Sequence, residues 1–85
     1  MAYQLYVGSR WDRETTNGLL LKILQKRHEG FSFMPMTGCY KGLLEESWLI
    51  IIEDDLAKII LSMSDLRKAL EQEVIGWQKV PTINF

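Results

Sequence analysis

Apolar and polar residues recur along this chain in patterns that predict six secondary-structure elements. Short runs rich in β-branched or aromatic residues predict strands over residues 3–7, 31–36 and 74–80, and a continuous apolar run predicts another over residues 47–52. Apolar residues at helical spacing predict a helix over residues 16–28 and a longer one from residue 54 or 55 to about residue 73. The expected order is strand, helix, strand, strand, helix, strand.

The continuous apolar run is typical of a strand in the middle of a sheet. Trp48, Ile50 and Ile52 alternate along it with Leu49 and Ile51, so both faces of this strand are apolar. Helices on one side of the sheet would cover only one of these faces. The other face predicts that the chain self-associates.

The order of the elements limits the topologies that the chain can adopt. Right-handed crossovers give an antiparallel sheet with both helices on one face, which is a single α+β domain over residues 1–85 with the order βαββαβ. In the first strand the odd positions, Tyr3, Leu5 and Val7, are expected to face the core. Pro35 suggests that the second strand is an edge strand or carries a bulge.

Local signals set the expected ends of these elements. Thr15 or Thr16 is the expected N-cap of the first helix, and Gly30 is the expected stop after it. Residues 37–42 are interpreted as a turn between two strands. We expect His28 to lie in solvent near the end of the first helix, where a positive charge suits the helix dipole.

Composition and charge narrow the class of protein. The chain has 85 residues, 47% of them hydrophobic and 25% charged, which suits one globular core. Its net charge is −1 and its basic residues are scattered, so we expect no nucleic-acid partner. Cys39 is the only cysteine, which excludes an internal disulfide and fits a reducing compartment. With no apolar run of about 20 residues and no signal-peptide pattern in residues 1–8, we expect no membrane partner and a cytoplasmic location.

Few residues suggest catalysis through a familiar motif. His28 stands apart from any set with metal-ligand spacing, so no metal site is expected. Cys39 has no identifiable base to activate it as a nucleophile. Glu45 and Glu46 are either solvated hairpin residues or carboxylates placed to meet a cation. The aromatic residues are expected mainly in the core or at an interface, although the faces of Tyr and Trp rings also attract cations.

One short segment resembles a known family. Thr37-Gly38-Cys39-Tyr40, followed by Glu45-Glu46 and an apolar strand, resembles the phage-encoded S-adenosylmethionine lyases, formerly called SAM hydrolases. That family has the same order of strands and helices, with a similar TGCY turn and Glu-Glu pair. At the level of residues only these two elements are specific, and the connection between Tyr40 and Glu46 is tighter here.

The resemblance implies a reaction, an assembly and a set of site residues. It implies a PII-like trimer of ferredoxin-like subunits in the host cytoplasm, with S-adenosylmethionine as substrate between subunits and no cofactor. The substrate's own carboxylate would attack its γ-carbon, giving homoserine lactone and methylthioadenosine. By family match Glu46 and Tyr40 are the catalytic candidates that hold the substrate's amino group, with Glu45 as the register alternative. Weaker candidates for substrate contacts are Ser9, Arg10, Gly38 and Cys39.

Two other functions fit the same fold. One is a non-catalytic PII-like or ferredoxin-like module that binds a nucleotide or a host protein, and the other is a purely structural oligomer. A fold of this kind does not by itself imply a reaction. Turnover of S-adenosylmethionine separates the enzyme from both alternatives.

Overall fold

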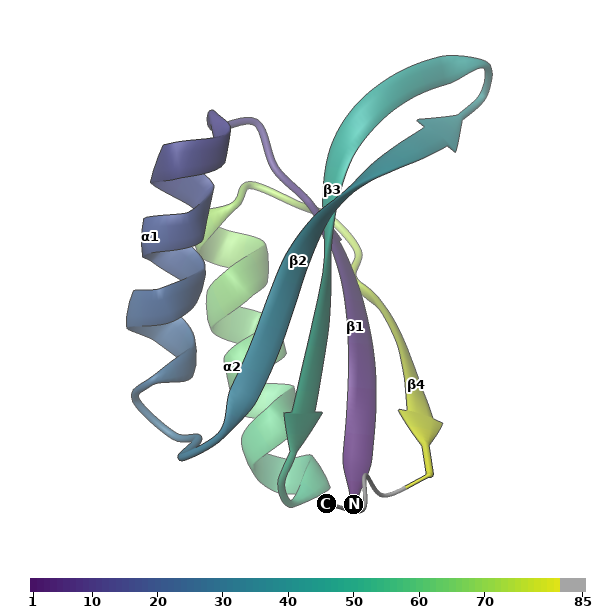
Figure 1. Ribbon diagram of the computed structural model, residues 1–85. Coiled ribbons are helices and arrows are strands. Elements are labelled where there is room, and N and C mark those ends of the chain that lie inside the picture. Colours follow the sequence, from purple (N-terminus) through teal and green to yellow (C-terminus); the bar gives the residue numbers. More distant parts are fainter. Residues whose placement is uncertain (82–85) are drawn as a thin grey trace.

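The computed structural model describes residues 1–81, and of Tyr40 it describes the backbone (Figure 1). The elements follow the order βαββαβ, as the sequence predicts. Their bounds are β1 (Ala2–Gly8), α1 (Arg13–Leu24), β2 (Phe31–Tyr40), β3 (Leu43–Glu53), α2 (Leu56–Ala69) and β4 (Gly76–Val80).

The four strands form one sheet in the order β2-β3-β1-β4, and every neighbouring pair is antiparallel. Both helices lie on the same face of this sheet (Figure 1). The predicted α+β fold, with a ferredoxin-like sheet and two helices on one face, is therefore confirmed. The apolar strand β3 lies inside the sheet, and Pro35 lies in the edge strand β2, where a missing backbone N–H is tolerated.

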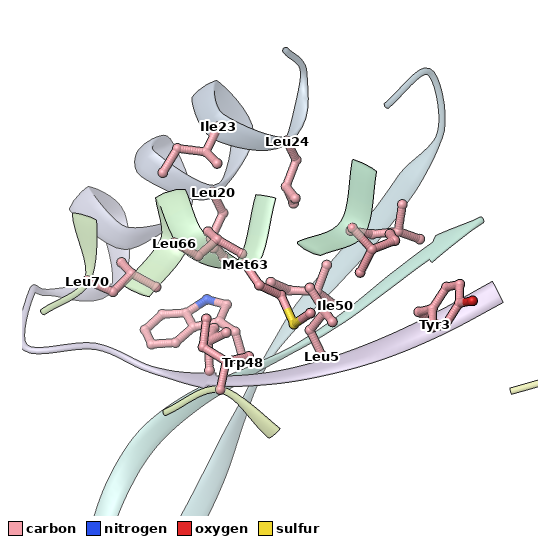
Figure 2. Packing of buried hydrophobic residues seen from close by; sticks show 14 residues of the cluster. Tyr3, Leu5, Leu20, Ile23, Leu24, Trp48, Ile50, Met63, Leu66 and Leu70 are labelled. Atoms are coloured by element: carbon pink, nitrogen blue, oxygen red, sulfur yellow. The ribbon is translucent and has the colours of Figure 1, made fainter. Parts of the chain in front are cut away.

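The core fills the space between the sheet and the helices (Figure 2). From β1 it receives the odd positions, Tyr3, Leu5 and Val7, as predicted. From β3 it receives Trp48, Ile50 and Ile52, and the register places Leu5 directly beside Ile50. The helices and the chain after α2 complete it with Leu20, Ile23, Leu24, Ile59, Met63, Leu66, Leu70 and Ile75.

The first helix begins and ends earlier than the sequence pattern indicates. It starts at Arg13, because the carboxylate of Asp12 accepts a hydrogen bond of 2.7 Å from the backbone N–H of Thr15 and caps the helix. The expected cap at Thr15 or Thr16 is wrong, since Thr15 lies within α1 and the hydroxyl of Thr16 is buried. The helix ends at Leu24, which leaves His28 in the following connection.

The central hairpin is longer than predicted. Residues 37–42 were expected to form a turn, but the ladder between β2 and β3 continues to the pair Tyr40 and Leu43. Only Lys41 and Gly42 form the turn, with φ of 51° and 78°. Two residues with positive φ are typical of a type I′ hairpin loop, whose twist matches that of the paired strands. The end of this hairpin, residues 36–47, is called the distal hairpin below and projects beyond the helices (Figure 1).

The second helix and the last strand are shorter than predicted. Asp55 holds the N-cap position of α2, as expected, although its side chain makes no capping hydrogen bond. The helix ends at Ala69 rather than near residue 73, and Glu71 has a positive φ of 53°. A residue in the left-handed region commonly ends a helix. The strand β4 then begins at Gly76 instead of residue 74.

The face of the sheet without helices is partly apolar. Leu49 and Ile51 of β3 are half-buried there, and Met34 of β2 lies beside Leu49 in the register and is exposed. Across β1 and β4 the same face is polar, because Gln4 accepts a hydrogen bond of 3.0 Å from Gln78. Within residues 1–81 no helix is long and apolar enough to cross a membrane.

Candidate functional site

The register of the distal hairpin separates the two adjacent glutamates. Glu46 lies opposite Thr37, and Glu45 lies opposite Gly38. Since successive strand residues point to opposite faces, Glu46 is on the face that Trp48 presents to the helices. Glu45 is on the other face. The sequence pattern alone leaves this choice open.

An ion pair joins Glu46 to the start of α1. The guanidinium Nη2 of Arg13 lies 3.2 Å from Oε1 of Glu46. Both side chains are more than half exposed, at 59% for Arg13 and 55% for Glu46. An exposed pair of this kind contributes about 0–1 kcal/mol, so it is easily exchanged for other partners. The carboxylate of Glu46 is therefore accessible on an open surface, with the Arg13 guanidinium beside it.

The other hairpin candidates lie close by along the ladder. A Cβ at Gly38 would lie 2.8 Å from Oγ of Ser47, so the strands approach too closely there for a side chain unless Ser47 moves. Cys39 is exposed and pairs with Leu44. The backbone of Tyr40 pairs with Leu43, and its side chain lies outside the described part of the chain.

Ser9 and Arg10 make contacts at the same end of the molecule but with other partners. The hydroxyl of Ser9 lies 2.8 Å from that of Thr16 and accepts a hydrogen bond of 3.0 Å from the backbone N–H of Trp11. The guanidinium of Arg10 lies 3.6 Å from the carboxylate of Glu71. Both residues therefore help to order the connection between β1 and α1. Their proposed substrate contacts stay a prediction.

Arg13 is the residue of this site that the sequence analysis missed. The helix predicted over residues 16–28 does not include it, whereas the structure makes it the first residue of α1. Its partner Glu46 lies 33 residues away along the chain. An aspartate at an N-cap position directly before it is a signal that would have started the helix at Arg13. The contact with the hairpin depends on the tertiary packing of α1.

A second polar arrangement lies inside the molecule. His28 is buried, and its Nδ1 lies 2.8 Å from Oδ2 of Asp54 while its Nε2 lies 2.7 Å from Oγ of Ser62. The expectation of a solvated His28 is wrong, because the chain after α1 brings the imidazole against α2. The hydrogen bond from His28 holds the pKa of the Asp54 carboxyl below its ordinary value of 3.8.

These three side chains have the connectivity of a Ser-His-Asp triad but not its accessibility. A nucleophile has to reach a substrate, and Ser62 is fully buried. Every buried side-chain nitrogen or oxygen in the described residues has a hydrogen-bond partner. The arrangement is therefore a structural connection between the end of α1 and α2.

Comparisons with solved structures show the same fold in proteins of several kinds. A phage SAM lyase in its apo state superposes with a TM-score of 0.65 at 23% identity, over 91% of this chain and 78% of that one. A DUF3240 family protein from Shewanella baltica OS155 gives a TM-score of 0.65 at 11% identity, over 98% of this chain and 96% of that one. The periplasmic divalent cation tolerance protein CutA from Archaeoglobus fulgidus gives 0.63 at 12% identity, over 100% of this chain and 87% of that one.

Sequence comparisons add nothing to this result, since no protein-family model matches the chain and no curated protein matches it. At these identities the structural likenesses show the fold alone. That fold is the ferredoxin-like α+β arrangement which this chain shares with a phage SAM lyase and with CutA.

Proposed function

We propose that this protein is an S-adenosylmethionine lyase. The observation that carries the proposal is the accessible carboxylate of Glu46, paired with Arg13, in the hairpin that holds the TGCY and Glu-Glu elements. The likeness to a phage SAM lyase over 91% of the chain supports it. A substrate with an ammonium group is a suitable ligand for an exposed carboxylate.

The reaction needs little from the protein because the substrate contains both reacting groups. One oxygen of the substrate's carboxylate attacks its γ-carbon, and the bond between that carbon and the sulfonium breaks. Both electrons of this bond go to sulfur, so the products are methylthioadenosine and homoserine lactone. The main task of the protein is to hold a folded conformer, and well-oriented intramolecular reactions reach effective molarities of about 10⁵ M or more.

Glu46 and Tyr40 are the residues proposed to hold this conformer. Glu46 accepts a charge-assisted hydrogen bond from the substrate's ammonium group, which is stronger than a neutral one. The backbone of Tyr40 is at a hairpin position on the opposite face from Glu46, so in this proposal its hydroxyl and ring reach the substrate from a neighbouring copy of the chain. There the hydroxyl contributes to the same ammonium group, and the ring shields the sulfonium from water. Because Glu46 lies on an open surface, a second copy of the chain completes the pocket.

The proposed assembly is a PII-like trimer that functions in the cytoplasm, which is the host cytoplasm if the protein is phage-encoded. Support comes from the sheet face without helices, where Leu49 lies beside the exposed Met34 and Ile51 is half-buried. Ile51→Lys places a charge on this face and should yield monomers in light scattering. Leu21→Lys, at an exposed position on α1, is the matched control and should leave the trimer intact. A monomeric parent protein at micromolar concentration would contradict the shared pocket.

The catalytic role is tested by removing one charge at a time. Glu46→Gln keeps the shape of the side chain and should lower turnover about tenfold or more, the effect of losing about 1.4 kcal/mol of transition-state stabilisation. Glu45→Gln is the matched control, since it removes a neighbouring charge on the opposite face of the strand. A large loss in Glu45→Gln with unchanged activity in Glu46→Gln would assign the role to Glu45.

The second candidate is a non-catalytic module that binds a nucleotide or a host protein. Its support is the fold shared with CutA and the DUF3240 family protein. This candidate predicts that S-adenosylmethionine stays intact during incubation with the protein. Calorimetric titration with S-adenosylmethionine and with ATP would then show whether either is bound without turnover.

A further inference from the structure

We propose that Arg13 is a substrate-positioning residue which binds the carboxylate of S-adenosylmethionine while Glu46 binds its ammonium group. This inference rests on the proposed function and extends it to the recognition of the amino-acid end of the substrate. Arg13 and Glu46 would thus act together as a clamp for an α-amino acid zwitterion.

The geometry of the ion pair matches the ligand. The guanidinium and the carboxylate lie 3.2 Å apart on an open surface. An α-amino acid carries an ammonium and a carboxylate on the same carbon, so it presents the two opposite charges at a similarly short spacing. Its binding exchanges one ion pair within the protein for two ion pairs with the ligand. The exposed pair costs little to open, because solvent already weakens it.

The elements that carry the two residues are tied together inside the molecule. Arg13 begins α1, whose first turn is fixed by the hydrogen bond from Thr15 to Asp12. The indole Nε1 of Trp48 donates a hydrogen bond of 2.9 Å to Oδ1 of Asn17, which joins β3 to α1. Trp48 is fully buried and lies two positions from Glu46 in the same strand. The spacing between the guanidinium and the carboxylate is therefore set in part by this partly buried hydrogen bond and not only by the ion pair itself.

The chemistry of the reaction decides which kinetic constant Arg13 affects. The carboxylate is the nucleophile, and a guanidinium that holds one of its oxygens leaves the other free to reach the γ-carbon. The guanidinium stays charged throughout the accessible pH range, so the contact exists before and during the reaction. The carboxylate loses its negative charge as its oxygen bonds to the γ-carbon, so its ion pair with the guanidinium is no stronger in the transition state than in the ground state. Loss of such an interaction appears in KM more than in kcat.

The test compares three variants with the parent protein. Arg13→Gln should raise KM for S-adenosylmethionine about tenfold with a smaller change in kcat, the size expected for one charge-assisted hydrogen bond. Arg13→Lys keeps the charge and should recover part of this loss. Lys22→Gln removes an exposed charge elsewhere on α1 and is the control, with KM unchanged. Circular dichroism of each variant checks that the fold is retained.

Inhibition by methylthioadenosine, a product without the amino-acid part of the substrate, shows whether Arg13→Gln affects only carboxylate binding or damages the whole pocket. Methylthioadenosine has no carboxylate and no ammonium group, so its inhibition constant should be the same for Arg13→Gln and the parent protein. Equal KM values for S-adenosylmethionine in these two proteins would overturn the inference. A lower KM in Arg13→Gln would also overturn it, because Arg13 would then only compete with the substrate for Glu46.

Binding and turnover by the parent protein distinguish a failure of the proposed lyase function from a failure of the proposed role of Arg13. A parent protein that neither binds nor converts S-adenosylmethionine contradicts the lyase function, and the role of Arg13 falls with it. An active parent protein whose Arg13→Gln variant has an unchanged KM contradicts only the role of Arg13.

Discussion

Replacing His28 with alanine tests whether the buried hydrogen bonds hold α1 against α2. The imidazole forms hydrogen bonds of 2.8 Å with the carboxylate of Asp54 and 2.7 Å with the hydroxyl of Ser62. The His28 side chain is inaccessible to solvent. His28→Ala removes both hydrogen bonds at once. The hydroxyl of Ser62 is then left in a fully buried position, and the space of the ring is left empty.

The expected loss of stability follows from these contacts. A hydrogen bond to a charged group contributes about 1.5–3 kcal/mol, and a buried donor left without a partner costs about 1–3 kcal/mol. Rebonding of the Ser62 hydroxyl to a backbone carbonyl in α2 would recover part of this cost. We therefore expect the free energy of unfolding to fall by about 3 kcal/mol, which lowers Tm by about 12 °C or more in a domain of this size.

Urea denaturation followed by tryptophan fluorescence measures this loss. Gln25→Ala, at an exposed position beyond the end of α1, is the control and should change stability by less than about 0.5 kcal/mol. The double variant with Ser62→Ala should lose less than the sum of the two single changes, because it also removes the buried hydroxyl that has lost its partner. A loss below about 1 kcal/mol in His28→Ala, or strict additivity with Ser62→Ala, would refute the reasoning.

Two further predictions concern pH and Tyr40. The Asp54 carboxyl has its pKa lowered in the folded state, chiefly by the hydrogen bond from His28, so it stabilises the fold above its ordinary pKa of 3.8 and loses this effect as the pH falls towards the lowered value. The stability gap between the parent protein and Asp54→Asn should thus narrow below about pH 4 in acid titrations, and a gap that is constant with pH would contradict this account. Tyr40→Phe should leave the trimer intact and reduce lactone formation at equal folded concentration, whereas equal rates would return Tyr40 to a structural role.

The sequence was sufficient for the order of elements and for most of the core. Alternation of Tyr3, Leu5 and Val7 predicts which face of β1 is buried, because it has a period of two along one strand. The run around Ile50 is apolar on both faces, so its sequence identifies an inner strand and leaves the helix-covered face to be set by the fold. The ends of the elements were less predictable. Residues 37–42 were interpreted as a turn, but the turn needs only Lys41 and Gly42, whose positive φ values suit a two-residue loop.

The contacts that build the candidate site depend on tertiary structure. From the sequence, Glu45 and Glu46 are equally good candidates for the carboxylate of the site. Only the register of the hairpin shows which face of the strand each one is on. Arg13 meets Glu46 across 33 residues, which no local pattern encodes. His28 illustrates the same point, because a histidine after a helix is usually solvated, yet two partners from the region of α2 stabilise it in the interior.

Incubation of the protein with S-adenosylmethionine in ¹⁸O-labelled water tests the central claim most directly. Intramolecular displacement yields methylthioadenosine and an unlabelled lactone, and later hydrolysis of the lactone at its acyl carbon places ¹⁸O in the carboxylate of homoserine. Direct attack of water on the γ-carbon would instead place ¹⁸O in the γ-hydroxyl group. Chromatography with mass spectrometry should therefore show methylthioadenosine together with unlabelled lactone. Intact S-adenosylmethionine, or homoserine labelled at its γ-hydroxyl, would contradict the account.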